Sequence, residues 1–278
     1  MSLIVSVTSI SSRLPVLRHT LISLLDQHCK PDRIVLLLSK EPYLMDDGVS
    51  DLPPWLDAMV ARRDIELQWV ENTGPYRKLM PIYRTATDED AIVTCDDDVI
   101  YGPDWLSALV SAAKANAESI ICGRARRVVK NIVNRRQSYI NWPLVNGSLE
   151  ATDILPIGIA GVLYRKPLLW RRMMLSNDFL EIAPTQDDLW FDAARKRAGK
   201  NVFVAQDAGS RIYPIKVPRA LSGINVSKNI IMMRDGVAAR SIRRVGLKTM
   251  GYLGFATCDN DSALDRLNDY LHRLDQAI

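Results

Sequence analysis

Short apolar runs alternate with segments of helical periodicity through the first half of the chain. Apolar runs predict strands over residues 3–8, 33–39, 65–70, 91–95 and 119–122. Apolar positions at helical spacing predict helices over residues 16–28, 54–62, 81–86 and 103–115. Repeated strand–helix–strand units favour an α/β fold of Rossmann-like type, in which a mostly parallel sheet is flanked by helices on both faces.

The second half of the chain is less regular. Residues 128–146 show no clear period, and residues 155–164 indicate a loop followed by a strand. A helix is predicted over 186–198, then a short strand over 202–205, and a final amphipathic helix over 262–276. We therefore expect a main domain over residues 1–215, with a C-terminal helical or irregular extension over 216–278 packed on it.

Composition narrows the class of protein. No stretch of 18 or more residues is apolar enough for a transmembrane helix, and no basic region precedes the first predicted strand as it would in a signal peptide. The 4 cysteines are far apart, which favours free thiols in a reducing cytoplasm over a zinc site. The net charge of +4 is too small to indicate a nucleic-acid partner.

The basic residues are nevertheless clustered. Such clusters are typical either of a solvated face or of a surface for an anionic membrane or a phosphate-bearing acceptor, so peripheral membrane association is one expectation. The clusters are Arg124, Arg126, Arg127, Lys130, Arg135 and Arg136, then Arg171 and Arg172, then Arg240, Arg243, Arg244 and Lys248.

Three adjacent carboxylates, Asp96, Asp97 and Asp98, directly follow the predicted strand 91–95. Like charges this close repel one another, and a divalent metal would remove that cost. The D-x-D spacing of Asp96 and Asp98 lets alternate side chains face one ligand, and hard oxygen ligands suit Mg²⁺ or Mn²⁺. The alternative is a solvated turn that caps the next helix, but Asp104 can cap it instead.

A second acidic pair, Asp187 and Asp188, lies at the start of the predicted helix 186–198. Aspartate at a helix start is favoured by N-capping and by the helix dipole. A carboxylate there can also act as a general base toward an acceptor hydroxyl. The two roles are compatible, since one acid can cap while the other faces a site.

Weaker candidates lie in loops between the predicted elements. Lys78 or Arg77, in the run GPYRK, could pair with a diphosphate, and Arg13 in the loop after the first strand is similar. Gly158 and Gly161 flank a small-residue loop that either bends the chain or admits the backbone close to a substrate. The three histidines are expected to be structural or exposed.

Taken in order, several segments resemble the GT-A class of glycosyltransferases, closest to bacterial polysaccharide-building enzymes of the large inverting family. The resemblance spans roughly residues 4–192 and rests on VSVTSISSRLPVLRHTLISLLDQHCKPDRIVLLLS, GPYRKLMPIY, IVTCDDDVIYGPDWL, GIAGVLYRK and TQDDLWF. It implies a GT-A fold in which residues 1–215 bind a nucleotide-diphosphate sugar. It also implies one inverting displacement onto an acceptor hydroxyl of a glycan or lipid-linked molecule, in surface polysaccharide or glycan synthesis. We expect the protein in the cytoplasm or, through its basic clusters, at the inner face of the membrane.

The resemblance also implies roles by position. Asp188 would be the catalytic base with Asp187 beside it, and Asp98 with Asp96 would hold Mn²⁺ or Mg²⁺. The loop with Gly161 and Trp190 would face the donor or acceptor sugar. The nucleotide-sugar would be bound by Thr8, Ser9, Arg13, Glu41, Lys78, Asp96 and Asp97. Two departures from the pattern are a missing late histidine ligand, since no histidine lies between His28 and His272, and the absence of a QxxRW motif of processive synthases.

Three other functions compete with this hypothesis. A haloacid-dehalogenase-like phosphohydrolase also carries D-x-D after a hydrophobic strand, but usually after the first strand of its core. A sugar nucleotidyltransferase would need a glycine-rich loop where this chain has SISSRLP. A non-catalytic carbohydrate-binding relative would keep the fold without metal-dependent hydrolysis of the donor.

Overall fold

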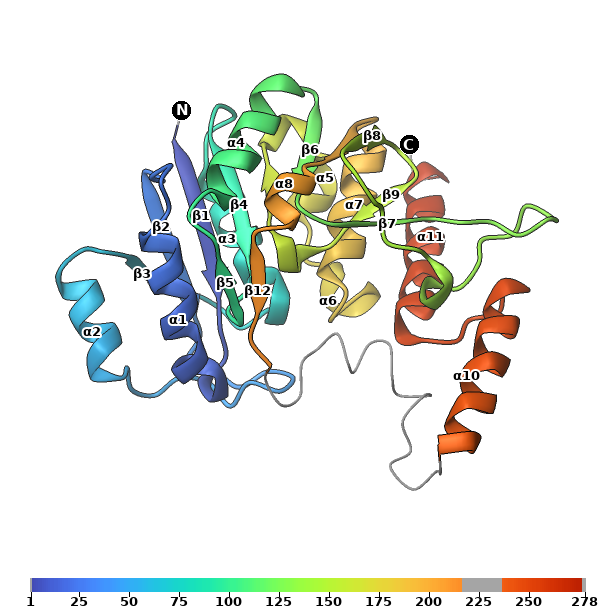
Figure 1. The fold of residues 1–278 in the computed structure, drawn as a ribbon, viewed down its shortest axis with the longest axis horizontal. Coiled ribbons are helices and arrows are strands. Elements are labelled where there is room, and N and C mark those ends of the chain that lie inside the picture. Colours follow the sequence, from blue (N-terminus) through green and yellow to red (C-terminus); the bar gives the residue numbers. More distant parts are fainter. Residues whose placement is uncertain (1, 217–236, 277–278) are drawn as a thin grey trace.

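The computed structural model describes residues 2–216 and 237–276, and its centre is an eight-stranded sheet (Figure 1). The strand order is β3-β2-β1-β4-β10-β6-β11-β8. The strands are β1 (Leu3–Thr8), β2 (Arg33–Leu38), β3 (Glu66–Trp69), β4 (Ala91–Cys95), β6 (Ser119–Cys122), β8 (Leu149–Ala151), β10 (Val162–Tyr164) and β11 (Asn201–Val204). Each apolar run that predicted a strand in the first half therefore forms one.

The sheet is mostly parallel, as predicted. β1 pairs in parallel with β2 on one side and with β4 on the other, so Val7 lies between Leu36 and Cys95. β10 runs antiparallel between β4 and β6, and β8 is antiparallel to β11 at the edge. Because β1 and β4 are parallel neighbours, their carboxyl ends meet at one edge of the sheet, where parallel α/β sheets bind ligands.

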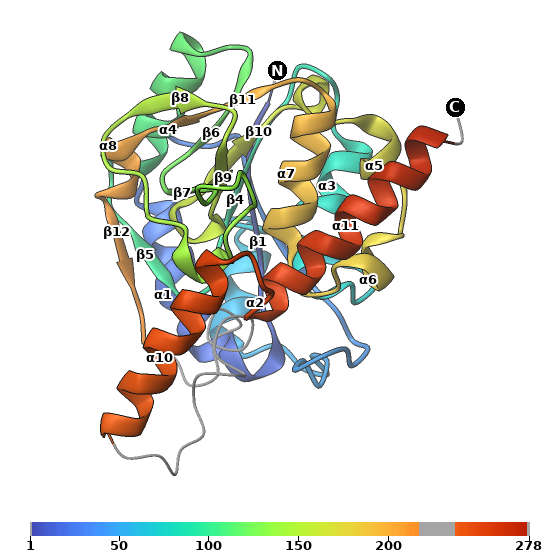
Figure 2. The same ribbon diagram turned by 90° about the vertical axis from the view of Figure 1, so that its right-hand side faces the viewer.

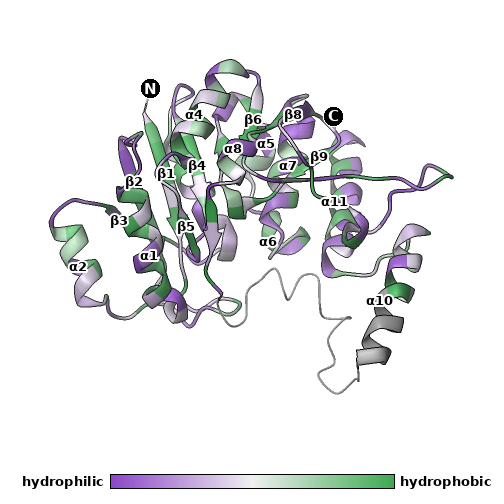
Figure 3. Ribbon diagram, in the orientation of Figure 1, coloured by the Kyte–Doolittle hydropathy of each residue, from purple (hydrophilic) through white to green (hydrophobic). Residues whose placement is uncertain are grey.

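Helices cover both faces of the sheet (Figures 1 and 2). Strand residues alternate between two hydrophobic clusters: Ile4 and Ile92 face one, Val5 and Val93 the other. One face packs against α1 (Leu14–Leu25), α2 (Pro54–Ala61), α4 (Trp105–Ala115) and α8 (Gln206–Gly209). The other packs against α3 (Met80–Thr85), α5 (Arg171–Leu175), α6 (Phe179–Ile182), α7 (Asp187–Arg197) and α11 (Asp259–Gln276). Figure 3 shows the resulting hydrophobic strands at the centre of the molecule.

Two small antiparallel pairs were not predicted from the sequence. β5 (Val99–Tyr101) pairs with β12 (Ile212–Pro214), and β7 (Ala125–Arg127) pairs with β9 (Ile154–Pro156). The first pair lies beside the aspartate run, where Ile215 N donates a hydrogen bond of 2.7 Å to the carbonyl of Asp98. Each of these strands is three residues long, too short to show a period.

Two helices form the described part of the C-terminal segment. α10 (Val237–Tyr252) was not predicted, whereas α11 matches the predicted final helix but begins three residues earlier. α11 packs on the main body through Ala263, Leu267 and Tyr270, and the Tyr270 ring lies 5.4 Å from that of Trp190. Among the described residues, no helix is both long and apolar enough to cross a bilayer.

Candidate active site

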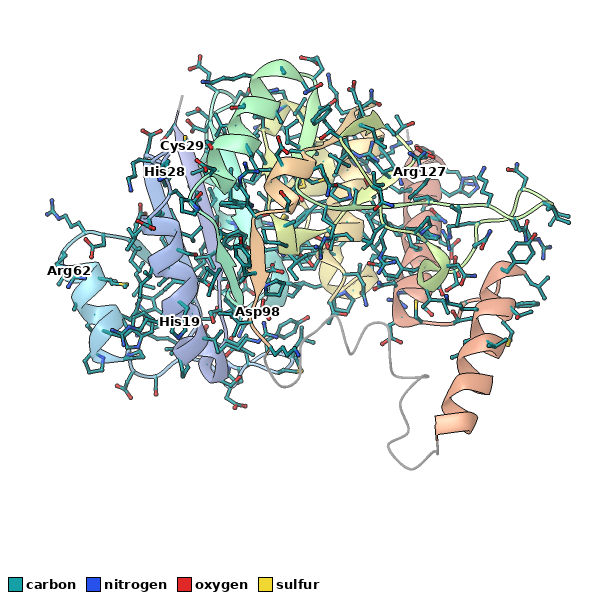
Figure 4. All side chains as sticks on the ribbon, viewed as in Figure 1. His19, His28, Cys29, Arg62, Asp98 and Arg127 are labelled. Atoms are coloured by element: carbon teal, nitrogen blue, oxygen red, sulfur yellow. The ribbon has the colours of Figure 1, made fainter. Side chains whose placement is uncertain are left out.

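A cavity of about 300 Å³ opens at the carboxyl ends of β1 and β4. It brings together the loop after β1, both acidic motifs and the GPYRK segment, which are far apart in the sequence. Figure 4 labels Asp98 at this lower edge of the sheet, with His28 and Cys29 toward the opposite end. The charged or polar predicted residues that line the cavity are Thr8, Ser9, Arg13, Lys78, Asp96, Asp97, Asp98, Asp187 and Asp188.

Asp97 holds the loop after β1 in place. Its carboxylate accepts hydrogen bonds from Ser9 Oγ at 2.5 Å and from Arg13 Nη1 at 2.9 Å. Its backbone carbonyl accepts from Thr20 Oγ1 on α1 at 2.8 Å. Burial raises the pKa of Asp97 against the opposing effect of Arg13 and Ser9. Asp97 is thus placed to fix Ser9 and Arg13 at the cavity wall.

Lys78 joins the two acidic motifs, an arrangement that the sequence did not predict. Its Nζ lies 3.2 Å from Asp96 Oδ1 and 3.0 Å from Asp187 Oδ2. Burial alone would lower the pKa of Lys78, but Asp187, Asp96 and Asp188 outweigh burial, so the pKa is well above its ordinary value. Lys78 therefore remains a cation and holds α7 against the end of β4.

Asp188 lies in the first turn of α7 with its carboxylate in the cavity. Its Oδ2 accepts a hydrogen bond of 3.2 Å from Gly158 N. Burial and the neighbouring Asp187 raise the pKa of Asp188 to about 7, against the opposing effect of Lys78. A carboxylate with a pKa near neutrality suits proton abstraction from a hydroxyl group at physiological pH.

Gly158 lies close to two charged groups of the cavity. A Cβ at this position would lie 2.9 Å from Lys78 Nζ and 3.3 Å from Asp188 Oδ1. Gly161 was expected to face a sugar, but its backbone approaches Trp105 instead, and a Cβ there would lie 2.3 Å from Trp105 Cζ2. Of the two glycines, Gly158 lines the cavity and Gly161 does not.

Trp190 was also expected to face a sugar, and the structure corrects that prediction. Its side chain is fully buried in the hydrophobic cluster between α7 and α11, beside Phe179 and Tyr270. Trp190 follows Asp188 by two positions, and on a helix such neighbours point in different directions. The residue stabilises the packing of α7 and does not line the cavity.

A buried ion pair, Asp46 and Arg77, occupies the place where an acid was expected from Glu41. Arg77 Nη2 donates to Asp46 Oδ2 at 3.0 Å and to the carbonyl of Ser9 at 3.1 Å. Glu41 is exposed and lies outside the cavity lining. Arg77 is committed to Asp46, which leaves Lys78 as the cation of GPYRK that faces the other carboxylates. The only sequence signal for Asp46 was its position after the second strand.

The carboxylates in the cavity outnumber the cations. Those that line it are Asp46, Asp96, Asp97, Asp98, Asp187 and Asp188, against the cations Arg13, Arg77 and Lys78. Burial and the neighbouring Asp96 and Asp97 raise the pKa of Asp98 to about 6, although Arg13 Nη1 lies 3.5 Å from its Oδ2. A divalent cation would offset this surplus of negative charge, so the donor set fits Mg²⁺ or Mn²⁺.

The protein alone does not supply a complete metal shell. Among residues 2–216 and 237–276, no cluster of three or more histidine, cysteine, aspartate or glutamate side chains could hold a metal ion. The cavity lining contains no histidine from this part of the chain. A metal held by one or two carboxylates would take its remaining ligands from substrate phosphates and water, as Mg²⁺ commonly does.

A model of glycosyl transferase family 2 matches residues 7–172, which include the loop after β1, Lys78 and the aspartate run. No curated protein matches the sequence.

Solved structures of S. aureus TarS share the fold. The complex with UDP is 15% identical with a TM-score of 0.50, covering 74% of this chain and 58% of TarS. The complex with UDP-GlcNAc is 13% identical with a TM-score of 0.50, covering 92% of this chain and 74% of that one. The chain therefore spans about 58% of the first of these structures.

Proposed function

The chain belongs to glycosyl transferase family 2, and on that premise we propose that it moves a sugar from a nucleoside-diphosphate donor to an acceptor hydroxyl, with metal assistance and inversion. The observation that carries the proposal is the convergence of Asp96, Asp98 and Asp188 on one cavity around Lys78. The likeness to structures that contain UDP or UDP-GlcNAc makes a UDP-sugar the first donor to test.

The donor would lie between the loop after β1 and the aspartate run. Thr8, Ser9 and Arg13 line the side of the cavity next to Asp97, where a nucleotide would meet polar groups and one guanidinium. Asp96 and Asp98, with substrate phosphates, would hold Mg²⁺ or Mn²⁺, which when bound would neutralise charge on the departing diphosphate. Arg13 lies beside both Asp97 and Asp98, with its Nη1 2.9 Å and 3.5 Å from their carboxylate oxygens.

Asp188 would act as the base. The Asp188 carboxylate and Lys78 Nζ both lie close to Gly158. In a single displacement, the acceptor hydroxyl oxygen forms the new bond at the anomeric carbon while the bond to the diphosphate breaks. The hydroxyl proton passes to Asp188. One base and one displacement give inversion at the anomeric carbon.

Lys78 would be a positioning residue for this reaction. Its ammonium group compensates Asp96 and Asp187, which reduces the repulsion between these two carboxylates. Because Asp187 is paired with Lys78, Asp188 is the member of the pair that remains to accept a proton.

The proposal is tested by measuring release of the nucleoside diphosphate. The full chain is incubated with UDP- and GDP-sugars and Mn²⁺, with and without oligosaccharide or lipid-linked acceptors, and separately with simple phosphate esters. We expect UDP or GDP release that requires the metal. Free phosphate from the esters, with no diphosphate release from any sugar nucleotide, would contradict the proposal and favour a phosphohydrolase.

A further inference from the structure

A loop with two apolar side chains at its end projects from the body of the protein. The tip loop, residues 130–136, follows β7 and extends away from the sheet (Figure 1). The exposed fraction is 91% for Ile132 and 67% for Val133. Single exposed apolar residues are common on protein surfaces, but two adjacent ones at the end of a projecting loop indicate a contact surface.

Hydrogen bonds fix the tip loop in this conformation. Asn131 Oδ1 accepts from Val133 N at 3.1 Å and from Arg135 N at 3.0 Å. Asn131 N donates to the carbonyl of Arg135 at 2.9 Å, and Lys130 and Arg136 form a β-bridge at the base of the loop. The turn itself therefore holds Ile132 and Val133 in solvent.

A second apolar turn lies against the first. Asn131 Nδ2 donates to the carbonyl of Tyr252 at 3.0 Å, at the end of α10. Gly254 packs on the backbone and side chain of the residues at the base of the tip loop, with a positive φ of 88°. On either side of it, Leu253 is 49% exposed and Phe255 is 53% exposed. Two contacting turns thus present four apolar side chains to solvent.

The tip loop and the segment before it are basic, whereas Asp259, Asp261 and Asp265 follow the second turn. Residues 124–137 contain 6 lysines and arginines and no acid. Lys130, Arg135 and Lys248 are exposed and form no ion pair with another described residue. The hollow beside the tip loop is lined by Arg126, Lys248 and uncharged residues that include Ile140 and Pro143, with no carboxylate from the described part of the chain.

We propose that the tip loop and the turn at 252–255 together dock the protein on an anionic lipid bilayer. The apolar side chains would enter the boundary between headgroups and acyl chains, while Lys130, Arg135 and Lys248 would meet the lipid phosphates.

The proposal selects among the basic clusters of the sequence. Lys130, Arg135 and Arg136 of the first cluster lie in the tip loop, and Lys248 of the third lies on α10, which ends at the second turn. Arg172 of the second cluster lies over the ring of Trp170, on α5 and outside these turns. The side chains of Arg240, Arg243 and Arg244 lie outside the described residues. The docking surface is connected to the cavity through Tyr139, which lines the cavity seven positions after Ile132.

Vesicle co-sedimentation of the full chain tests the proposal. The vesicles contain either phosphatidylcholine alone or an equimolar mixture of phosphatidylcholine and phosphatidylglycerol. We expect binding to the anionic vesicles that weakens with added salt, and little binding to the neutral ones. The paired substitutions Ile132→Gln with Val133→Gln should weaken binding at least about tenfold, and Lys130→Gln with Arg135→Gln should do the same.

Matched controls separate this surface from general effects. Ile22→Gln removes an exposed apolar side chain on α1, and Arg18→Gln with Lys114→Gln removes the same charge from α1 and α4. These controls should bind like the unsubstituted chain. Equal binding to both vesicle types, or unchanged binding by both tip-loop variants, would overturn the proposal. So would a dimer in solution that the Ile132→Gln and Val133→Gln chain loses, because the surface would then contact a second copy.

Discussion

At the scale of single residues, the two acids of the second acidic motif, Asp187 and Asp188, have different partners. Lys78 pairs with Asp187 and Asp96, whereas Asp188 accepts only the Gly158 N–H among the interactions of the described residues. The ammonium group of Lys78 therefore forms its ion pairs with the neighbours of Asp188. Burial then determines the proton affinity of Asp188, whose pKa rises to about 7.

The raised pKa of Asp188 predicts how activity depends on pH. A base must be ionised, so kcat/KM should rise as pH increases through about 7 and level off above it. A profile of kcat/KM between pH 5.5 and pH 9 (roughly the range in which a carboxylate so perturbed titrates) measures this. A profile that is flat across neutrality would contradict the assignment of Asp188 as the base.

Gly158→Ala tests the fit between the glycine loop and the two functional groups. The added methyl would lie 2.9 Å from Lys78 Nζ, so Lys78 or Asp188 must move. We expect kcat/KM to fall about tenfold, the equivalent of about 1.4 kcal/mol. Gly246→Ala on α10, where a Cβ has nothing within 4 Å, is the matched control and should leave kcat/KM unchanged. Equal activity of both variants would show that Gly158 does not constrain the site.

At the scale of elements, the sequence predicted the strands and helices that have long apolar or amphipathic patterns. β1, β4 and α7 were predicted within one or two residues because buried strands and an amphipathic helix leave strong periodic signals. β5 and β12 were missed because each has three residues and is defined by its partner, not by its own sequence. α10 was missed because two glycines, Gly246 and Gly251, interrupt its apolar pattern.

Only those residues of the candidate site that follow a predicted strand or begin a predicted helix could be found from the sequence. Asp96, Asp98 and Asp188 follow or begin strong elements, so topology alone brought them to one edge. Asp46 was missed because it lies in a loop with no period, and only its contact with Arg77 marks it. The wrong prediction for Trp190 has another cause. Its ring packs against Tyr270 of α11, and the apolar pattern of α7 alone does not show which later helix will cover it.

Asp261 connects the C-terminal helix to the cavity wall. In the first turn of α11, its carboxylate accepts from Ser138 Oγ at 2.5 Å, Tyr139 N at 2.7 Å and Thr257 N at 2.8 Å. Asp261→Ala should lower the free energy of unfolding by about 2–3 kcal/mol, because several buried donors lose a charged acceptor. Denaturant unfolding measures the change.

The matched control for this prediction lies one turn later on α11. Asp265 is exposed and pairs with Arg136 at 2.6 Å, so Asp265→Ala should cost less than about 1 kcal/mol. If Asp261→Ala were as stable as Asp265→Ala, α11 would not depend on its contact with the segment that contains Tyr139.

At the scale of the whole molecule, the fold gathers acidic groups at one end and basic groups at another. The cavity edge holds a surplus of carboxylates, and the tip loop holds a surplus of cations. Such a distribution allows one ligand type at each end: a cation with a diphosphate in the cavity, and anionic headgroups at the tip loop. Neither end depends on the overall net charge of +4.

Asp98→Ala tests the role of the cavity charge in donor binding. UDP with Mn²⁺ should raise the melting temperature of the unsubstituted chain, because a ligand that binds only the folded state stabilises it. Asp98→Ala should lose this metal-dependent rise, while the exposed control Asp104→Ala should keep it. An equal rise in all three chains would exclude Asp98 as a metal ligand.

The most direct test of the central claim is sugar transfer by Asp188→Asn, measured beside donor binding. The amide is close in shape to the carboxylate but takes no proton, so transfer should fall by about 10²–10⁴-fold while donor affinity changes little. The pKa of Asp188 is near 4 in the unfolded chain and about 7 in the folded chain. Between these two pH values only the folded chain holds the proton, so the ionisation of Asp188 at higher pH destabilises the fold. Asp188→Asn should therefore be at least as stable as the unsubstituted chain at pH 8 (roughly one unit above that pKa). Transfer at the normal rate by this folded variant would contradict the account.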